Sequence, residues 1–265
     1  MSGGTQGVRA DDALETGKLH EQLARRLARE IVSGRLEVDS TFPPSEDLSA
    51  RYGVSRTVSR ETVQALASAG LVSVHHGRRS VVAPSSSWRF LDGLVKYAIA
   101  REQLSGELAA DLFEVRAIME EAATLRCAAR ATEAELRELV DRAHACLTTV
   151  RDENHDLDRD WLAEEDLAFH RAIATGANNH VLAHLVTDVR LELIPTWAAD
   201  QLHRAEIITV WEEHSRIAEL LLSGDGVAAR EAMTNHMTAS VRTTLRRVFP
   251  EGEQSAIDAR WSRDA

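Results

Sequence analysis

The sequence predicts a mostly α-helical protein made of a small N-terminal domain with one β-hairpin and a larger all-α helical bundle. The composition favours helix, because Ala, Leu, Arg and Glu are abundant whereas Phe, Trp and Tyr together make up 5% of the chain. Short β-branched runs bounded by turn residues occur only near residues 71–82. Charge also divides the chain, since residues 1–84 contain 11 basic and 10 acidic residues and residues 85–265 contain 20 and 32.

The bulk composition limits what the chain can be. Its 265 residues, 44% hydrophobic and 28% charged, suit globular domains with real cores. No apolar run approaches the roughly 20 residues of a membrane span, and residues 1–16 lack the apolar core of a signal peptide. We therefore expect a disordered leader and a cytoplasmic protein. Cys127 and Cys146 form no CxxC motif, which predicts buried free thiols in a reducing compartment.

The N-terminal domain is predicted over residues 17–83 and begins with two helices. Apolar residues recur every four positions over 18–33, which indicates a helix that ends at Gly34. A Phe-Pro-Pro segment then breaks the chain, and Ser45 is placed to cap a short helix that runs to Tyr52.

A helix-turn-helix and a hairpin complete this domain. Gly53 makes the turn, Ser55 caps a third helix and Gly70 ends it. Two β-branched runs, 71–74 and 80–82, flank a basic His-His-Gly-Arg-Arg segment, which predicts a hairpin. Together these elements describe a winged helix-turn-helix.

The rest of the chain reads as helix. Residues 84–88 form a polar break and the predicted linker, 89–249 the helical domain, and 250–265 a loose tail. One apolar stripe, from Leu108 to Ala122 through Val115, is expected to face the core. The predicted helices lie near 88–104, 107–129, from the capping box at Thr132, and at 158–176, 178–200, 203–223 and 225–248, with a kink near Pro195.

The third helix has two different faces when its residues are placed at 100° intervals. Its apolar side is expected to pack, and its polar side offers guanidinium, hydroxyl and amide groups that suit base edges and phosphates in a major groove. Any surface helix can carry arginines, so the interpretation depends on the turn and the basic hairpin beside it. The polar side consists of Arg56, Thr57, Arg60, Glu61, Gln64 and Ser68, and the hairpin tip contains His76, Gly77 and Arg78.

The net charge of −11 repels polyanions, so contact with nucleic acid must be confined to such a small footprint. The segment GVSRTVSRETVQALASAGLVSVHHGRRSVV resembles the operator-reading domain of GntR-type bacterial transcription regulators, and the likeness covers residues 18–83. The resemblance implies that Arg56, Thr57 and Arg60 contact double-stranded operator DNA, with His76 and Gly77 at the wing.

Two positions depart from the GntR pattern. Ser45-Glu46 stands where the family usually has Glu-Arg, and a glutamate cannot make the phosphate contact of an arginine. Asp39 stands where the family often has glycine.

Four residues of the helical domain are candidate metal ligands. Asp166 and His170 lie four apart and share a helix face, while His214 and His236 lie on two further predicted helices. A carboxylate and imidazoles from three helices suit Zn²⁺ or another first-row divalent ion. The alternative is chance, since a chain with 11 histidines often shows such spacing and a buried histidine is more often simply hydrogen-bonded.

A second resemblance extends the first. The segments FEVRAIMEEAATLRCAARAT, DLAFHRAIATGANNHVL and EHSRIAELLLSGDGVAAREAMTNHM are similar to the effector domain (FCD-like) of FadR-type GntR regulators. The likeness implies that Asp166, His170, His214 and His236 hold a metal, and that Arg116 and Asn179 belong to the effector site.

The expected function is a DNA-binding transcription regulator, in particular a homodimeric repressor controlled by a small carboxylate. A metal and Arg116 would make the pocket positive, as a carboxylate requires. The stretch SSSWRFLDGL resembles regulators responsive to galactonate and similar sugar acids, with lactate, gluconate or another hydroxy acid left open. No nucleophile motif points to catalysis. The alternatives are a metal-dependent enzyme on a helical bundle and a ligand sensor that acts through a protein partner.

Overall fold

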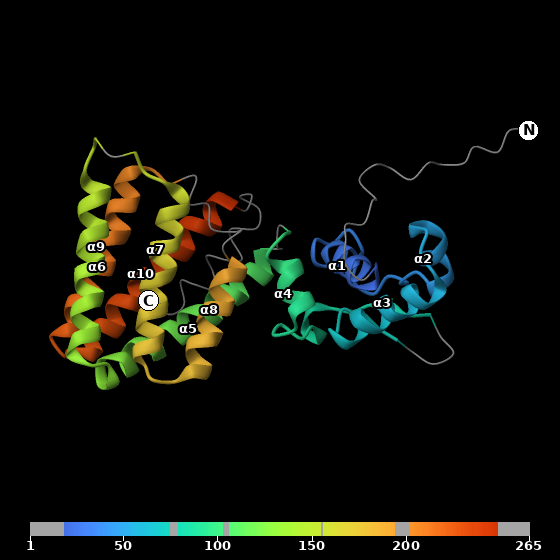
Figure 1. The fold of residues 1–265 in the computed structure, drawn as a ribbon, viewed down its shortest axis with the longest axis horizontal. Coiled ribbons are helices and arrows are strands. Elements are labelled where there is room, and N and C mark those ends of the chain that lie inside the picture. Colours follow the sequence, from blue (N-terminus) through green and yellow to red (C-terminus); the bar gives the residue numbers. More distant parts are fainter. Residues whose placement is uncertain (1–18, 75–78, 103–105, 155, 194–201, 249–265) are drawn as a thin grey trace, which may run out of the picture. The chain divides into compact units, whose positions relative to one another are not determined.

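A computed structural model describes residues 19–74, 79–102, 106–154, 156–193 and 202–248, and divides the chain after Leu104 into two compact units (Figure 1). The fold class is confirmed, because the described residues are mostly helical with one small hairpin. The predicted leader, the tail, Pro195 and the hairpin tip lie outside the described residues.

The N-terminal unit is a winged helix-turn-helix. Its two strands pair antiparallel with Val72 opposite Val82, and Thr41 forms an additional bridge to Val81. Phe42 and Leu48 are fully buried, and they form the core of this unit together with the inner faces of its helices. The elements are α1 (Leu19–Val32), α2 (Ser45–Tyr52), α3 (Arg56–Ser68), β1 (Val72–Ser73), β2 (Val81–Val82), the 3₁₀ turn η2 (Ser85–Ser87) and α4 (Gly93–Ile99).

The turn between α2 and α3 follows the sequence expectation. Gly53 adopts φ +66°, which a residue with a Cβ adopts only at a cost, and its N–H donates to the carbonyl of Ser49. The hydroxyl of Ser55 accepts a hydrogen bond from the N–H of Val58 at 3.2 Å and caps α3. The prediction for Ser45 was wrong: Pro44 occupies the cap position without a side-chain bond, and Ser45 is the first helical residue.

At residues 84–88 the structure differs from the prediction of a linker. This segment packs on the winged helix-turn-helix: the indole N–H of buried Trp88 donates to the carbonyl of Ala83 at 3.2 Å. A Cβ on Gly70 would lie 2.1 Å from the carbonyl oxygen of Ser87, so the two backbones are in close contact. The polar composition of the segment predicted a surface position but not this packing.

The α4 helix also belongs to the N-terminal unit, although the sequence placed it in the helical domain. It packs against α1, and beyond it the carboxylate of Glu102 contacts Arg29 at 2.5 Å and Arg35 at 3.1 Å. The guanidinium of Arg25 lies over the ring of Tyr97, 5.0 Å from its centre. The chain therefore remains attached to the first unit as far as Glu102.

The second unit contains only helices among its described residues. Buried Phe169 and Ile173 of α7 pack in its main core with Ile217 of α9 and Met233 of α10. Each helix predicted from residue 107 onward is present within a few residues of its expected ends, except that the expected end at residue 200 lies outside the described residues. The elements are α5 (Gly106–Arg130), α6 (Glu133–Arg151), α7 (Arg159–Gly176), α8 (His180–Leu193), α9 (Arg204–Leu222) and α10 (Gly226–Val248).

The buried face of α5 differs from the prediction. Leu108 and Leu112 are buried as expected, but Val115 is 45% exposed. The inward positions further along the helix hold the charged residues Arg116 and Glu120. These charges have partners inside the bundle, so they occupy inward positions that the predicted apolar stripe did not include.

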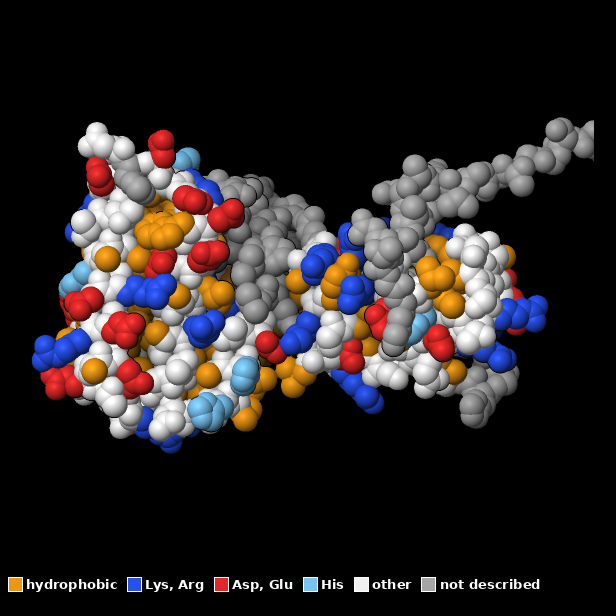
Figure 2. Space-filling model, in the orientation of Figure 1, with side chains coloured by type: hydrophobic (Ala, Val, Ile, Leu, Met, Phe, Trp, Pro, Cys, Tyr) orange, Lys and Arg blue, Asp and Glu red, His pale blue; other side chains and the backbone are white. Residues whose placement is uncertain are grey.

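The structure also bears on the predictions made for the two cysteines and for membrane-spanning segments. Cys127 and Cys146 are free and buried, and burial raises the pKa of the Cys127 thiol to about 11 and that of Cys146 to about 12. Within the described part of the chain, no helix combines the length and apolarity that crossing a membrane requires. Acidic side chains are scattered over the visible face of the helical unit (Figure 2).

Candidate functional site

The α3 helix presents the predicted polar face to solvent. Leu66 is fully buried beneath it, and so are two polar residues that fix the helix in place. The hydroxyl of Ser59 lies 2.9 Å from that of Ser49 in α2, and the hydroxyl of Thr62 donates to the carbonyls of Val58 and His20. The exposed residues are Arg56, Thr57, Arg60, Glu61, Gln64 and Ser68, as the helical wheel predicted.

The rest of the predicted DNA-contact set is only partly visible. His76, Gly77 and Arg78 lie outside the described residues, whereas Arg79 is described and exposed. Glu61 is 3.3 Å from the imidazole of His20 on α1, which places one carboxylate of the helix face beside a partner of its own unit. Glu46 is exposed in the first turn of α2, where a negative charge is favoured by the helix dipole.

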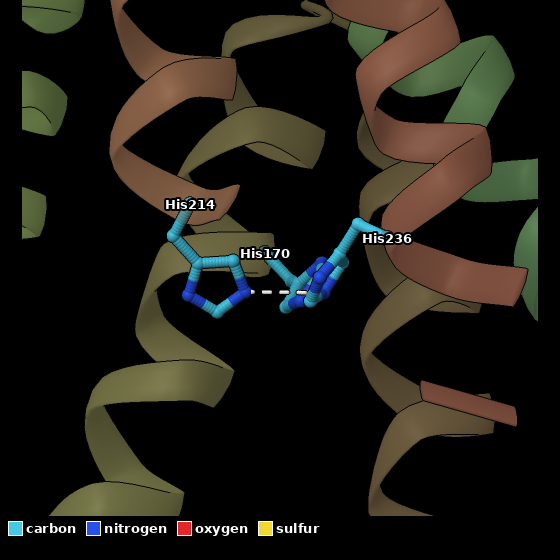
Figure 3. A group of neighbouring side chains, drawn as sticks. All are labelled: His170, His214 and His236. Carbon is cyan, nitrogen blue, oxygen red and sulfur yellow. Dashed lines mark hydrogen bonds between the residues drawn. The ribbon is translucent and has the colours of Figure 1, made fainter. Parts of the chain in front are cut away.

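Three buried histidines converge from three helices of the second unit (Figure 3). His170 lies on α7, His214 on α9 and His236 on α10, and each is at most 2% exposed. One ring nitrogen of each lies within 4.8 Å of the others, and Nε2 of His214 is 3.1 Å from Nε2 of His236. The sequence spacing alone did not show that these rings meet.

Asp166 completes the predicted set. Its Oδ1 is 3.6 Å from Nε2 of His214 and 3.9 Å from Nε2 of His170, because Asp166 and His170 are one helical turn apart on α7. Asp166 is 3% exposed, and its Oδ1 accepts no hydrogen bond from the described residues. A buried carboxylate oxygen without a donor is costly unless a cation or another donor approaches it.

Two carboxylates orient the imidazoles, and the sequence analysis missed both. Nδ1 of His170 lies 2.8 Å from Glu120, and Nδ1 of His236 lies 2.8 Å from Glu213. Because a carboxylate only accepts, each Nδ1 carries the proton, and the Nε2 lone pair faces the centre of the group. Histidines that bind a metal commonly donate their other ring N–H to a carboxylate in this way.

The charged side chains of the site form ion pairs. Arg116 donates to Oε1 of Glu120 at 3.2 Å and lies 3.4 Å from Nε2 of His170. Burial would raise the pKa of Glu120, but His170, Arg116 and Arg190 together lower it to about 2. Burial lowers the pKa of His170 to about 4 and that of His214 well below its usual value, so both are neutral at pH 7 and suited to bind a metal.

Arg190 is a further charged residue that the sequence did not single out. It projects from α8, is 2% exposed, and its Nη2 contacts Oδ2 of Asp166. The sequence signal was faint, since an arginine between Asp188 and Glu192 is as readily placed at the surface.

Asn179 is not brought to this group. It is exposed, and its Oδ1 accepts a hydrogen bond from the N–H of Leu182 at 3.1 Å, which caps the start of α8. A cavity of about 30 Å³ does border Asp166, and it is lined mainly by apolar residues such as Leu162 of α7 and Trp211 of α9.

The donor set fits a divalent metal. Zinc binds histidine nitrogen at ~2.0–2.1 Å, so neighbouring ligand atoms on a tetrahedral ion lie roughly 3.3 Å apart. Three of the six separations between the four donor atoms are 3.1, 3.6 and 3.9 Å, near this value, and the histidine nitrogens all lie within 4.8 Å of one another. Three imidazole nitrogens with one carboxylate favour zinc and other first-row ions over Mg²⁺ or Ca²⁺.

Comparison with known proteins identifies both units. Residues 19–82 match the family described as bacterial regulatory proteins, gntR family, and residues 111–239 match the FCD domain. An HTH-type transcriptional regulator of Mycobacterium tuberculosis is 30% identical over 84% of this chain and 88% of its own length. The chain belongs to the GntR family.

Two further relatives have names that state a role in transcription, and one of them is named for the galactonate operon. The galactonate operon transcriptional repressor of Escherichia coli is 24% identical over 84% of this chain and 95% of its own. The transcriptional regulator LutR of Bacillus subtilis is 26% identical over 84% of this chain and all of its own. All these relatives are transcription regulators, so the family supports a DNA-binding regulator and not an enzyme.

Solved structures agree with this GntR fold. Lar of Listeria monocytogenes is similar with a TM-score of 0.57 and 16% identity, over 89% of this chain and all of that one. Escherichia coli McbR/YncC has a TM-score of 0.50 and 16% identity, over 88% of this chain and all of that one.

Proposed function

We propose that this GntR-family regulator is a homodimeric repressor whose operator binding is controlled by a small hydroxy or sugar acid. Asp166, His170, His214 and His236 would hold a divalent metal, with Zn²⁺ favoured, beside the acid. The convergence of three buried Nε2 atoms and Oδ1 of Asp166 carries this proposal. A bound metal would supply positive charge and coordination positions for a carboxylate.

Operator reading is assigned to the exposed face of α3. Arg56, Thr57, Arg60 and Gln64 are solvent-exposed on a helix whose other face is anchored, so they are free to enter a major groove. The wing residues His76, Gly77 and Arg78 remain proposed contacts. Because one such small domain binds weakly, two copies on a pseudo-palindrome are needed for specific binding.

The homodimer is supported by the outward face of α5. Val115, Ile118 and Leu125 are 45%, 60% and 38% exposed and recur at helical spacing. They form one exposed apolar stripe, which a second copy could cover. A cytoplasmic location remains a prediction from the sequence.

The acid is proposed from the charges of the site and from the relatives. Arg116 and Arg190 are both buried within reach of the histidine group. Two relatives match most of this chain, and one is named for galactonate. D-Galactonate, D-gluconate and L-lactate are therefore the first ligands to test.

Fluorescence anisotropy on the intergenic DNA upstream of the gene tests the proposal. We expect salt-dependent binding that one of the acids weakens, and loss of the acid response after chelation or in His214→Ala. Arg60→Ala should weaken operator binding by about 10–100-fold, since a good base contact contributes about 1–3 kcal/mol.

The controls are two exposed residues away from both sites. His184→Ala and Arg230→Ala should behave as the wild type. Failure to bind any upstream fragment, with or without the acids, would contradict the proposed DNA function. An acid response that survives in His214→Ala would contradict the proposed metal site.

A further inference from the structure

The carboxylate of Asp166 is shared between two different groups. Oδ2 contacts Nη2 of Arg190, whereas Oδ1 faces Nε2 of His214 at 3.6 Å and Nε2 of His170 at 3.9 Å. All four side chains are at most 4% exposed. Asp166 is therefore both the counter-charge of Arg190 and the only carboxylate among the proposed ligands.

A second buried ion pair lies nearby and is arranged differently. Arg116 pairs with Glu120, whose other oxygen accepts from Nδ1 of His170 at 2.8 Å. Glu120 contacts the imidazole on the side away from its metal-facing nitrogen, whereas Arg116 lies 3.4 Å from that nitrogen. Among the described buried residues of the site, the two arginines are balanced by these two carboxylates.

We propose that Arg190 binds the carboxylate of the effector, and that a metal at Oδ1 of Asp166 favours this binding because it weakens the attraction between Asp166 and Arg190. This inference rests on the proposed function, because it assumes a metal at the histidines and an acid as effector. It adds Arg190 as the effector-binding residue and gives the reason why metal and acid depend on each other.

The buried guanidinium of Arg190 depends on a nearby negative charge. A buried guanidinium needs an anion close to it, because removing its partner leaves an uncompensated charge in a poorly solvated site. When Asp166 shares its charge with a metal, Arg190 loses part of its partner, and the site gains two positive charges. A carboxylate that enters beside Asp166 compensates both, so the acid and the metal should each raise the affinity for the other.

A change of the partner of Arg190 from Asp166 to an acid would also have a structural consequence. Arg190 lies on α8 and Asp166 on α7, so their contact ties the two helices together. The α8 helix also packs against α5. Movement of Arg190 from Asp166 to an acid would change this tie within the effector unit.

Zinc affinity of the full chain, measured by competition with a chromophoric chelator, tests the inference without reference to DNA. We expect D-galactonate, D-gluconate or L-lactate to raise the Zn²⁺ affinity of the wild type by about 5–100-fold. L-Lactamide and D-gluconamide, which lack the carboxylate, should have no such effect. In Arg190→Met the increase should fall below about twofold, while Arg230→Met keeps the wild-type response.

Each outcome decides a different part of the proposal. An acid-dependent increase that persists in Arg190→Met overturns the role of Arg190. If Arg190→Met does not fold, the wild type decides: equal effects of an acid and its amide overturn the inference, and an effect of the acid alone supports it. If zinc binds but no acid alters its affinity, the inference and the proposed acid response are overturned, and the proposed metal site is retained. If zinc does not bind, the inference and the proposed metal site are both contradicted.

Discussion

Asp39 shows how a single residue can hold a backbone conformation that usually belongs to glycine. It adopts φ +63° between α1 and the bridge residue Thr41, and its N–H donates to the carbonyl of Val82 at 3.0 Å. Aspartate tolerates this left-handed region better than most residues, but the Cβ still costs energy there. The departure from the family's glycine is therefore compatible with the same turn.

Substitution of Asp39 should reveal this conformational cost. We expect Asp39→Gly to raise the free energy of unfolding and Asp39→Val to lower it, each by about 1 kcal/mol, because valine is strongly disfavoured at positive φ. Chemical denaturation followed by circular dichroism measures both. If the valine variant is as stable as the glycine variant, the turn is not held in the left-handed conformation in solution.

At the scale of elements, periodicity located the helices but not always their buried faces. The α3 helix was predicted correctly, because its inner face is apolar or small and its outer face is polar. The α5 helix was not, because Arg116 and Glu120 are buried as a partnered ion pair and Val115 is exposed. A rule that places apolar residues inside cannot identify charged residues that are buried together with their partners, whether these lie on the same helix or on another one.

The same reason explains which site residues were predicted. Asp166 and the three histidines were recognisable as ligand types at a known spacing and through a family resemblance. Glu213 and Arg190 act only through contacts between helices, and such contacts become visible when the bundle is assembled. Asn179 resembled a site residue but caps α8 instead.

The exposed stripe on α5 leads to a prediction about assembly. Ile118→Glu should convert the proposed dimer to a monomer of 29.3 kDa, because burying an unpaired carboxylate in an interface costs several kcal/mol. Light scattering coupled to size exclusion measures the mass. Ala145→Glu, at an exposed position of α6, is the matched control and should remain dimeric. A dimeric Ile118→Glu would place the interface elsewhere.

At the scale of the whole molecule, the histidine group connects most helices of the second unit. Its ligands and their partners come from α5, α7, α8, α9 and α10. A metal that binds only the folded arrangement would therefore stabilise the whole bundle by mass action.

Metal removal should accordingly lower the thermal stability. With Zn²⁺ at about 100 times its dissociation constant, stabilisation is about 2.7 kcal/mol, which corresponds to a Tm increase of roughly 5–10 °C for a unit of this size. Differential scanning calorimetry with Zn²⁺ or with chelator measures the difference. His184→Ala should keep the shift and His214→Ala should lose it; identical Tm values for the wild type under both conditions would exclude a metal at this group.

The packing of Trp88, α4 and Glu102 on the winged helix-turn-helix determines where this protein can be recombined. A chimaera that joins at Ala83 would separate the indole from its native support and strip Arg29 and Arg35 of their shared carboxylate. A junction placed after Glu102 keeps these contacts within one parent. Biosensors that graft the proposed acid-binding unit onto a different operator specificity should therefore inherit α4 from the donor of the DNA-reading domain.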